Sequence, residues 1–166
     1  MKIFKIISGG QTGADKGGLI AAKKANIKTG GIAPKGFMTE AGKDPSLKSE
    51  YGLRENFSDD LKERTLSNLR GAHCTIVFAT KPGSRGTKFT IDSLKREKRM
   101  HLVLNPFETD AAEKVRDFLD LVYERYKNPL IVNIAGNRAS RSKGIEEKVE
   151  VEMPLPNGPT LDLSTI

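Results

Sequence analysis

The chain has 166 residues, of which 37% are hydrophobic and 30% are charged, with a formal net charge of +7. This length and composition fit a single soluble globular domain and exclude an intrinsically disordered chain. No run of about 18 apolar residues occurs and the first residues lack a signal-peptide pattern, so we expect no membrane association. The single cysteine, Cys74, lies in an apolar run and indicates a buried thiol in a cytoplasmic protein.

The positive charge is compatible with nucleic-acid binding, but the lysines and arginines are spread along the whole chain. No zinc-ligand spacing and no aromatic-basic RNA-binding pattern occurs, so we expect no nucleic-acid partner and no metal site. A small phosphorylated ligand fits the same charge balance.

Short apolar runs alternate with segments of helical period. We expect strands at residues 2–7, 30–32, 74–80, 100–105 and 129–136, and helices at residues 14–27, 58–72, 88–98, 110–127 and 143–150. This alternation predicts an α/β fold, an open parallel sheet of about five main strands with helices on both faces. The expected strand order is 2-1-3-4-5.

Two segments depart from this alternation. Residues 33–56 are rich in proline and glycine and read as a long loop, a kind that is usually functional or disordered. In the last segment, Val149, Val151 and Met153 alternate with glutamates as in a half-buried strand, and Asn157-Gly158 is a hairpin signal. We therefore assign the domain to residues 1–150 and a C-terminal extension to 151–166, which is an edge ribbon, an arm to a neighbouring subunit or a solvated tail.

A glycine-rich loop follows the first strand and opens a helix. Its residues are Ser8, Gly9, Gly10, Gln11, Thr12 and Gly13. Glycines let backbone N–H groups approach an anion at the start of a helix, so we expect this loop to hold a phosphate. The second strand lacks the following carboxylate that a ribose needs, and Lys35 stands nearby instead, which argues against a dinucleotide site.

Two further loops of this kind follow later strands. The loop after the central apolar strand contains Gly83, Ser84, Arg85, Gly86 and Thr87, and the loop after residues 129–135 begins at Gly136. Ligands of open parallel sheets bind at the carboxyl ends of the strands, so we expect all three loops and Lys35 to form one anion site.

Catalytic signals are weak. His73 and His101 are the only histidines, and both begin strands, at the end of the sheet away from the expected site. Asp15 and Glu40 are the nearest carboxylates to that site. No catalytic triad or metal-ligand spacing is present, so we expect a binding protein with no catalytic residues. Tyr51 and Arg54 either reach the site from the long loop or fix that loop in place.

Several motifs occur in a familiar order: SGGQTGAD, GGIAPKGFMTEAG, YGLREN, ERTLSNLRGAHCTIVF and IVNIAGNRASRSKGI. Together they resemble the molybdenum cofactor carrier family, a branch of the SLOG superfamily. The resemblance implies a Rossmann-like fold, a homo-oligomer (dimer or tetramer) and binding of molybdenum cofactor, as cargo, or a related phosphorylated pterin.

The resemblance leaves two other functions open. One is binding or sensing of a nucleotide-derived ligand, such as an ADP-ribose derivative, as suspected for many SLOG proteins. The other is hydrolysis of nucleoside monophosphates, the activity of a related SLOG group. That group has a glutamate where this chain has Thr90, so the general acid/base role is unfilled and this function ranks third.

Overall fold

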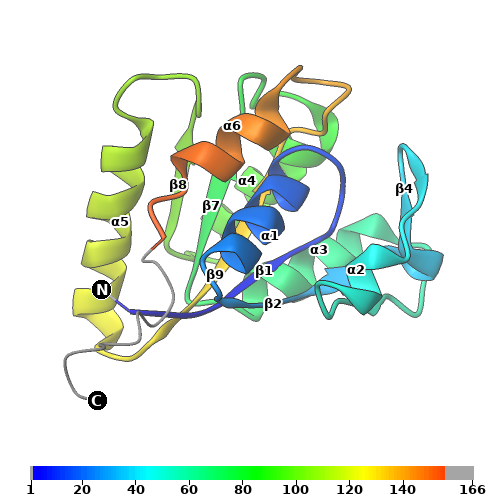
Figure 1. Cartoon of the computed structure of the whole chain (residues 1–166), viewed down its shortest axis with the longest axis horizontal. Coiled ribbons are helices and arrows are strands. Elements are labelled where there is room, and N and C mark those ends of the chain that lie inside the picture. Colours follow the sequence, from blue (N-terminus) through cyan, green and yellow to red (C-terminus); the bar gives the residue numbers. More distant parts are fainter. Residues whose placement is uncertain (1, 156–166) are drawn as a thin grey trace, which may run out of the picture.

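The computed structural model describes residues 2–155, which form an α/β structure around one five-stranded sheet (Figure 1). Every pairing in this sheet is parallel. The strands are β1 (Ile3–Ser8), β2 (Lys28–Gly30), β7 (Cys74–Phe78), β8 (His101–Leu104) and β9 (Leu130–Gly136). The predicted fold class and the five main strands are therefore confirmed.

The strands lie in the order β2-β1-β9-β7-β8. Numbered along the chain, the five main strands have the order 2-1-5-3-4, which differs from the expected 2-1-3-4-5 in the position of the last strand. β9 pairs with both β1 and β7 and occupies the centre of the sheet. Its buried Leu130, Val132 and Ile134 suit a central position, whereas the partly exposed β8 suits an edge.

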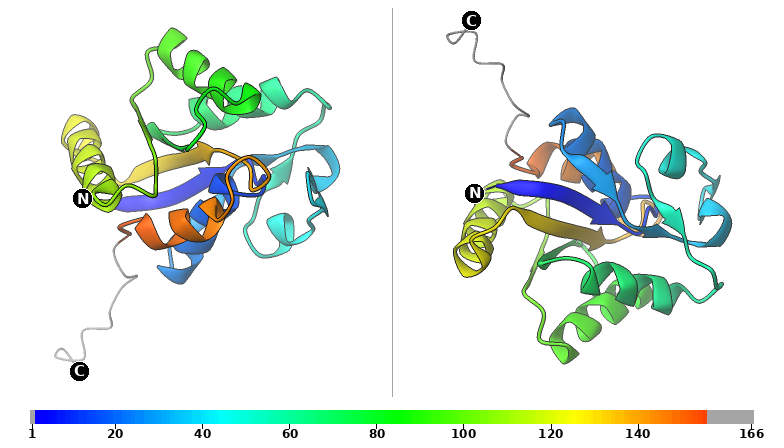
Figure 2. Two further views of the ribbon diagram at one scale, coloured as in Figure 1. Left: turned by 90° about the horizontal axis from the view of Figure 1, so that it is seen from above. Right: turned by 90° about the horizontal axis from the view of Figure 1, so that it is seen from below.

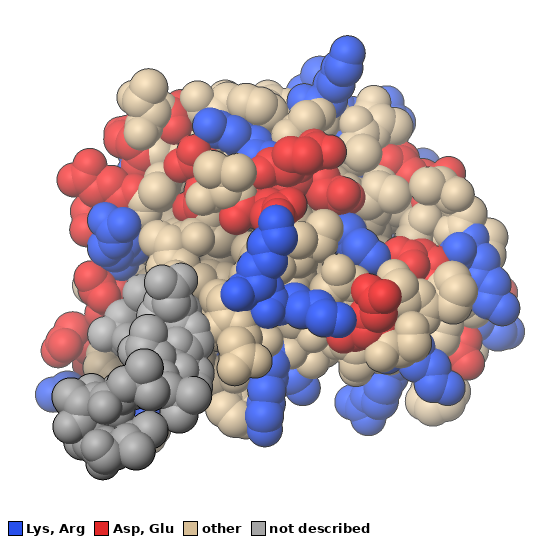
Figure 3. Space-filling model, viewed as in Figure 1, with Lys and Arg blue, Asp and Glu red and all other residues tan. Residues whose placement is uncertain are grey.

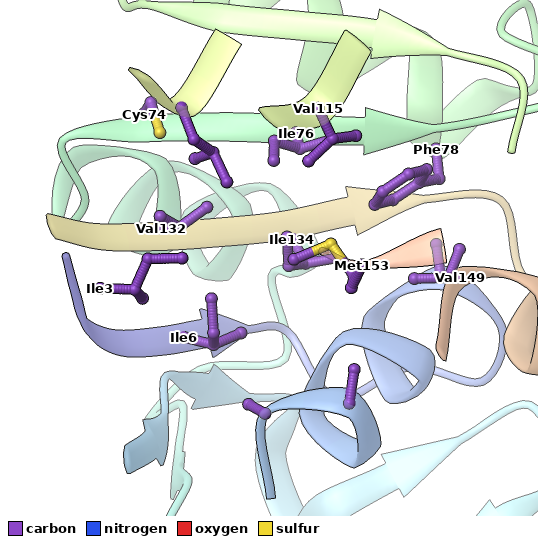
Figure 4. Packing of buried hydrophobic residues seen from close by; sticks show 14 of the residues in the cluster. Ile3, Ile6, Cys74, Ile76, Phe78, Val115, Val132, Ile134, Val149 and Met153 are labelled. Carbon is purple, nitrogen blue, oxygen red and sulfur yellow. The ribbon is translucent and has the colours of Figure 1, made fainter. Parts of the chain in front are cut away.

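Helices cover both faces of the sheet (Figure 2). One face carries α1 (Ala14–Lys24), α5 (Ala111–Tyr126) and α6 (Ile145–Glu152), and the other carries α3 (Leu61–Arg70) and α4 (Arg85–Arg96). Figure 4 shows the main core, where Ile76 and Ile134 of the sheet lie among side chains such as Val115 of α5 and Val149 of α6. This packing fixes the carboxyl ends of the strands, where the loops of interest begin.

The segment predicted as a long loop consists of short elements with a small core of their own. They are β3 (Ile32–Ala33), the 3-10 helix η1 (Lys35–Phe37), β4 (Met38–Thr39), β5 (Gly42–Lys43), α2 (Ser46–Ser49) and β6 (Arg54–Glu55). Leu47, Tyr51 and Leu53 pack there against Leu19 of α1. The loop prediction was wrong because these elements are too short to give a periodic pattern.

The predicted strand over residues 149–153 is also absent. Residues 149–152 belong to α6, and the side chains of Val149 and Met153 enter the main core. Packing of α6 against α1, and not the alternation of apolar and acidic residues, decides the conformation of residues 149–152. The Asn157-Gly158 hairpin signal lies outside the described residues. Within residues 2–155, no helix has the length and apolar character needed to cross a membrane.

Charged side chains of both signs are interspersed over the face shown in Figure 3. The net positive charge is therefore not gathered into one basic patch on that face.

Candidate functional site

A cavity of about 580 Å³ lies at the carboxyl ends of β1, β7 and β9, between the first turns of α3 and α4. It brings together one predicted residue of the first loop, four of the second and one of the third: Gln11, Ser84, Arg85, Gly86, Thr87 and Gly136. Convergence of three loops at this edge is the arrangement expected from the sequence.

The first turn of α4 forms one wall of this cavity. Within the described residues, the backbone N–H groups of Arg85, Gly86 and Thr87 donate no hydrogen bond. The first N–H groups of any helix lack intrahelical acceptors and carry a partial positive charge. This wall can therefore bind an anion, with the Arg85 guanidinium beside it.

Asn137, directly after β9, holds this wall in place. Its Oδ1 accepts hydrogen bonds from the N–H groups of Thr80 (3.0 Å) and Lys81 (2.9 Å). Its Nδ2 donates to the Lys81 carbonyl (3.0 Å) and to Thr87 Oγ1 (3.1 Å). Asn137 is 1% exposed, so its side-chain amide depends on these hydrogen bonds and not on water. Sequence reasoning missed this residue, because no motif distinguishes a linking asparagine from a loop asparagine.

The glycine-rich loop after β1 plays a different part from the one expected. Its N–H groups already have acceptors inside the protein: Gly10 donates to Ser8 Oγ, Gln11 to Asp15 Oδ2, and Gly13 to Glu146 Oε1, at 3.1 to 3.2 Å. The Asp15 and Glu146 carboxylates thus accept hydrogen bonds in the loop where the sequence predicts a phosphate.

The side chain of Arg64 of α3 lies against this loop and occupies the space that a side chain at Gly9 would need. Its Nη1 donates to the Gly9 carbonyl at 2.9 Å. A Cβ at Gly9 would lie 1.8 Å from that nitrogen. Arg64 Nε, which is buried, has no hydrogen-bond partner among the described residues. The motif ERTLSNLRGA contained Arg64, but sequence reasoning assigned it no role.

Asp15 and Arg64 are both buried, with Oδ2 and Nη1 3.8 Å apart. Burial raises the pKa of the Asp15 carboxyl to about 6, and the positive charges of Arg64 and Arg138 offset only part of that effect. Burial also lowers the pKa of Arg64, against the effect of Asp15. An arginine remains charged under these conditions, so the cavity has a fixed positive charge beside a carboxyl whose pKa is raised to about 6.

Charged side chains surround the rest of the cavity. They are the basic Lys62, Arg64, Arg85, Arg138 and Arg141 and the acidic Asp15, Glu40, Asp59 and Asp60. Phe89 adds an aromatic ring, with Lys62 Nζ 5.6 Å from the ring centroid. The lining thus combines cations that suit a phosphate with a ring that suits a flat heterocycle.

The other predicted site residues lie elsewhere. Ser8 is buried beneath the first loop, and its hydroxyl donates to the Asp15 carbonyl at 3.1 Å. Gly10 and Thr12 border a separate cavity of about 300 Å³. Gly9, Gly13, Lys35 and Gly83 line neither cavity.

Tyr51 and Arg54 do not reach the site. Tyr51 belongs to the small core of residues 33–56, and Arg54 is exposed in β6. Of the two roles left open, the structure favours fixing of the segment for Tyr51. The exposed Arg54 side chain has neither role among the described residues.

The histidines and the cysteine have structural surroundings. His73 Nδ1 accepts a hydrogen bond from the Ile131 N–H at 2.8 Å, and its ring lies edge-on to Tyr126 at 4.7 Å. His101 Nδ1 lies 2.7 Å from the Arg99 carbonyl. Cys74 is buried, as predicted, and burial raises the pKa of its thiol to about 12. Among residues 2–155, no group of three or more potential metal ligands is present.

Comparison with known proteins accounts for the strand order. The sequence model of the circularly permutated YpsA SLOG family matches residues 6–154. The chain belongs to this family. If the first strand of a 3-2-1-4-5 doubly wound sheet is moved to the end of the chain, the order becomes 2-1-5-3-4, which is the order observed for this family member.

Among solved structures, this SLOG protein is similar to one from Syntrophus aciditrophicus SB, determined at 1.45 Å resolution and described as a "Putative molybdenum carrier protein". The two share 29% sequence identity with a TM-score of 0.80, and the similarity covers 90% of this chain and 92% of the other. No curated protein matches the chain. The resemblance stated from the sequence is thus confirmed for family and fold.

Proposed function

We propose that this protein binds molybdenum cofactor, as cargo, or a related phosphorylated pterin in the 580 Å³ cavity. The observation that carries the proposal is the first turn of α4, where three successive N–H groups without acceptors among the described residues border the cavity beside Arg85. A phosphate at this position gains hydrogen bonds from the N–H groups and attraction from the helix start and the guanidinium.

The remaining lining supports the pterin part of the ligand. The cavity volume falls within the range of roughly 300–1,000 Å³ usual for small-molecule sites. Phe89, in the second turn of α4, offers a ring against which a flat heterocycle can stack. The similarity to a protein described as a molybdenum carrier supports the choice of a molybdenum-bearing pterin.

A nucleotide-derived ligand is the second candidate, because the same phosphate position and the same ring suit a nucleotide. Hydrolysis of a nucleoside monophosphate has less support. Thr90, at the position of the glutamate of the related hydrolases, donates its hydroxyl hydrogen bond to the Gly86 carbonyl at 3.1 Å and supplies no acid.

Ligand release and binding test the proposal. We expect the purified protein to release a fluorescent pterin on denaturation, or to bind added cofactor. We expect Arg85→Ala to weaken that binding about tenfold or more, since charge-assisted hydrogen bonds contribute roughly 1.5–3 kcal/mol. Lys95→Ala, an exposed change on the same helix away from the cavity, is the matched control.

A thermal-shift panel of pterins and nucleotides separates the two ligand classes. A rise in melting temperature with nucleotides alone would replace the carrier function by the sensor function. Absence of binding to either class would contradict both.

A further inference from the structure

Glu40, at the turn between β4 and β5, reaches across to two other loops. Its Oε1 accepts hydrogen bonds from Thr12 Oγ1 and from the Ser140 N–H (3.1 Å), and its Oε2 accepts one from Ser140 Oγ (2.5 Å). Thr12 lies in the glycine-rich loop and Ser140 in the loop after β9. One carboxylate therefore receives three hydrogen bonds from two segments that are far apart in the sequence.

The donors around this carboxylate are arranged for an anion. The Ala139 N–H donates to Thr12 Oγ1 at 3.3 Å, which leaves the threonine hydrogen free to point at Glu40. Burial alone would raise the pKa of Glu40, but the hydrogen bonds from Ser140 and Thr12, with the charge of Arg138, outweigh it and lower the pKa. Glu40 is thus an anion held in a set of N–H and O–H donors.

The carboxylate can leave this position without unfolding the hairpin. The backbone N–H of Glu40 donates separately to Gln11 Oε1 at 3.0 Å, which ties the main chain of the turn to the first loop. Residue Glu40 is exposed, so rotation of its side chain moves the carboxylate into water. Among residues 2–155, no lysine or arginine forms an ion pair with it, so its departure breaks only these hydrogen bonds.

We propose that Thr12 Oγ1 and the N–H and hydroxyl of Ser140, beside Arg138, form an oxyanion subsite that the Glu40 carboxylate fills until a ligand oxyanion displaces it. Glu40, Arg138 and Ser140 line the 580 Å³ cavity, whereas Thr12 borders the 300 Å³ cavity. The subsite therefore lies at the border of the larger cavity, as a second anion position besides the start of α4. The inference rests on the proposed function for the identity of the whole ligand. It specifies a ligand with two separate oxyanion groups.

Titration with inorganic phosphate tests the subsite directly. The Ser140 backbone N–H signal, followed by ¹⁵N NMR, reports binding at this position. Because Glu40 competes for the same donors in the wild-type protein, Glu40→Ala should bind phosphate at least tenfold more tightly, with a clear shift of the Ser140 signal. Glu40→Gln, which keeps the size of the side chain and removes its charge, should show a smaller gain in the same direction.

Two controls limit the interpretation. Glu124→Ala makes the same change of net charge on the exposed side of α5 and should leave the affinity for phosphate unchanged. Adding Thr12→Val to Glu40→Ala removes one donor and should reverse most of the gain. Equal phosphate affinity in Glu40→Ala and wild type, or an unmoved Ser140 signal, would overturn the subsite.

The variant Arg85→Ala separates this inference from the proposed function. In the double variant with Glu40→Ala, the phosphate-induced shift at Ser140 should persist, because among the described residues Arg85 forms no hydrogen bond with the subsite donors. If pterins and nucleotides fail to bind while this shift persists, the proposed function fails and the subsite stands. If they bind while the shift is absent, the reverse holds.

Discussion

Arg64 Nη1 lies 3.8 Å from Asp15 Oδ2 beneath the cavity and at the same time donates a hydrogen bond to the Gly9 carbonyl. The arginine thus joins the first turn of α3 to the glycine-rich loop and to the start of α1. Because both charged groups are buried, each depends on the other and on the hydrogen bonds around it. The pair therefore affects both the pH dependence of stability and the tolerance of Gly9 to substitution.

The buried Asp15 carboxyl should make the free energy of unfolding depend on pH. The folded-state pKa of Asp15, about 6, lies above its ordinary value of 3.8, so the folded protein holds this proton more tightly than the unfolded chain. The contribution of Asp15 to the free energy of unfolding is therefore most favourable below pH 4 and is lost as the pH rises through about 6. We expect Asp15→Asn to remove this loss.

Urea unfolding at pH 4 and pH 7 measures the effect. Relative to the wild type, Asp15→Asn should gain on the order of 1–3 kcal/mol between pH 4 and pH 7, since one pKa unit corresponds to about 1.4 kcal/mol. Asp120→Asn, an exposed change on α5, should show no such gain. A pH-independent difference between Asp15→Asn and wild type would contradict the raised pKa.

Gly9→Ala should disturb the position of Arg64, since the new Cβ would lie 1.8 Å from Nη1. We expect a loss of about 1–3 kcal/mol in the free energy of unfolding, the usual cost of overpacking a buried position. In an Arg64→Ala background the same glycine change should cost less, which a double-mutant cycle measures. Gly83→Ala, where a Cβ meets nothing within 4 Å, is the control. Additive costs would show that the two residues do not interact.

Asn137→Ala should destabilise the loop before α4, because it leaves the N–H groups of Thr80 and Lys81 without their acceptor. A loss of about 2–4 kcal/mol is expected from several buried polar groups without partners. Asn137→Asp keeps an acceptor for both N–H groups, and its protonated carboxyl can also donate to the Lys81 carbonyl, so it should lose less than Asn137→Ala in acid, below the pKa of that carboxyl. Thermal unfolding of both variants ranks them, and the reverse order would contradict the assigned roles.

Phe89 should contribute to binding of the heterocycle and not of the phosphate. Stacking of a base on an aromatic side chain is worth roughly 1–3 kcal/mol, so Phe89→Leu should weaken pterin or nucleotide binding about fivefold to a hundredfold. Affinity for inorganic phosphate should not change. Phe89→Tyr, which keeps the ring, should bind as the wild type does. Calorimetric titration of each variant with ligand and with phosphate distinguishes the two contributions.

The sequence predicted the fold class and the sheet edge that carries the site, because apolar runs and helical periods mark strands and helices without reference to their order. It could not predict that β9 lies between β1 and β7. In the permuted sheet, β9 takes the place of the first strand of an unpermuted sheet. The loop that corresponds to the first loop of an unpermuted sheet is therefore the one at Gly136 and Asn137, and not the glycine-rich loop after β1.

The same limit explains the roles within the glycine-rich loop. Its sequence is typical of a phosphate loop, but Arg64, Asp15 and Glu146, which supply its partners, come from α3, α1 and α6. Contacts between such distant segments leave no spacing pattern. The second loop, Ser84 to Thr87, does line the cavity. Its feature of interest, the free N–H groups at the start of a helix, is local and can be recognised in the sequence.

The central position of β9 has a consequence for the route of folding. β2 pairs with β1 and β8 pairs with β7, but these two pairs meet only through β9. Until residues 130–136 are available, each pair has an unpaired inner edge, and a growing chain must protect two such edges from association with other chains. Contacts this distant in sequence also favour slow folding. The cavity, whose walls come from both halves, forms only when the last strand is inserted between them.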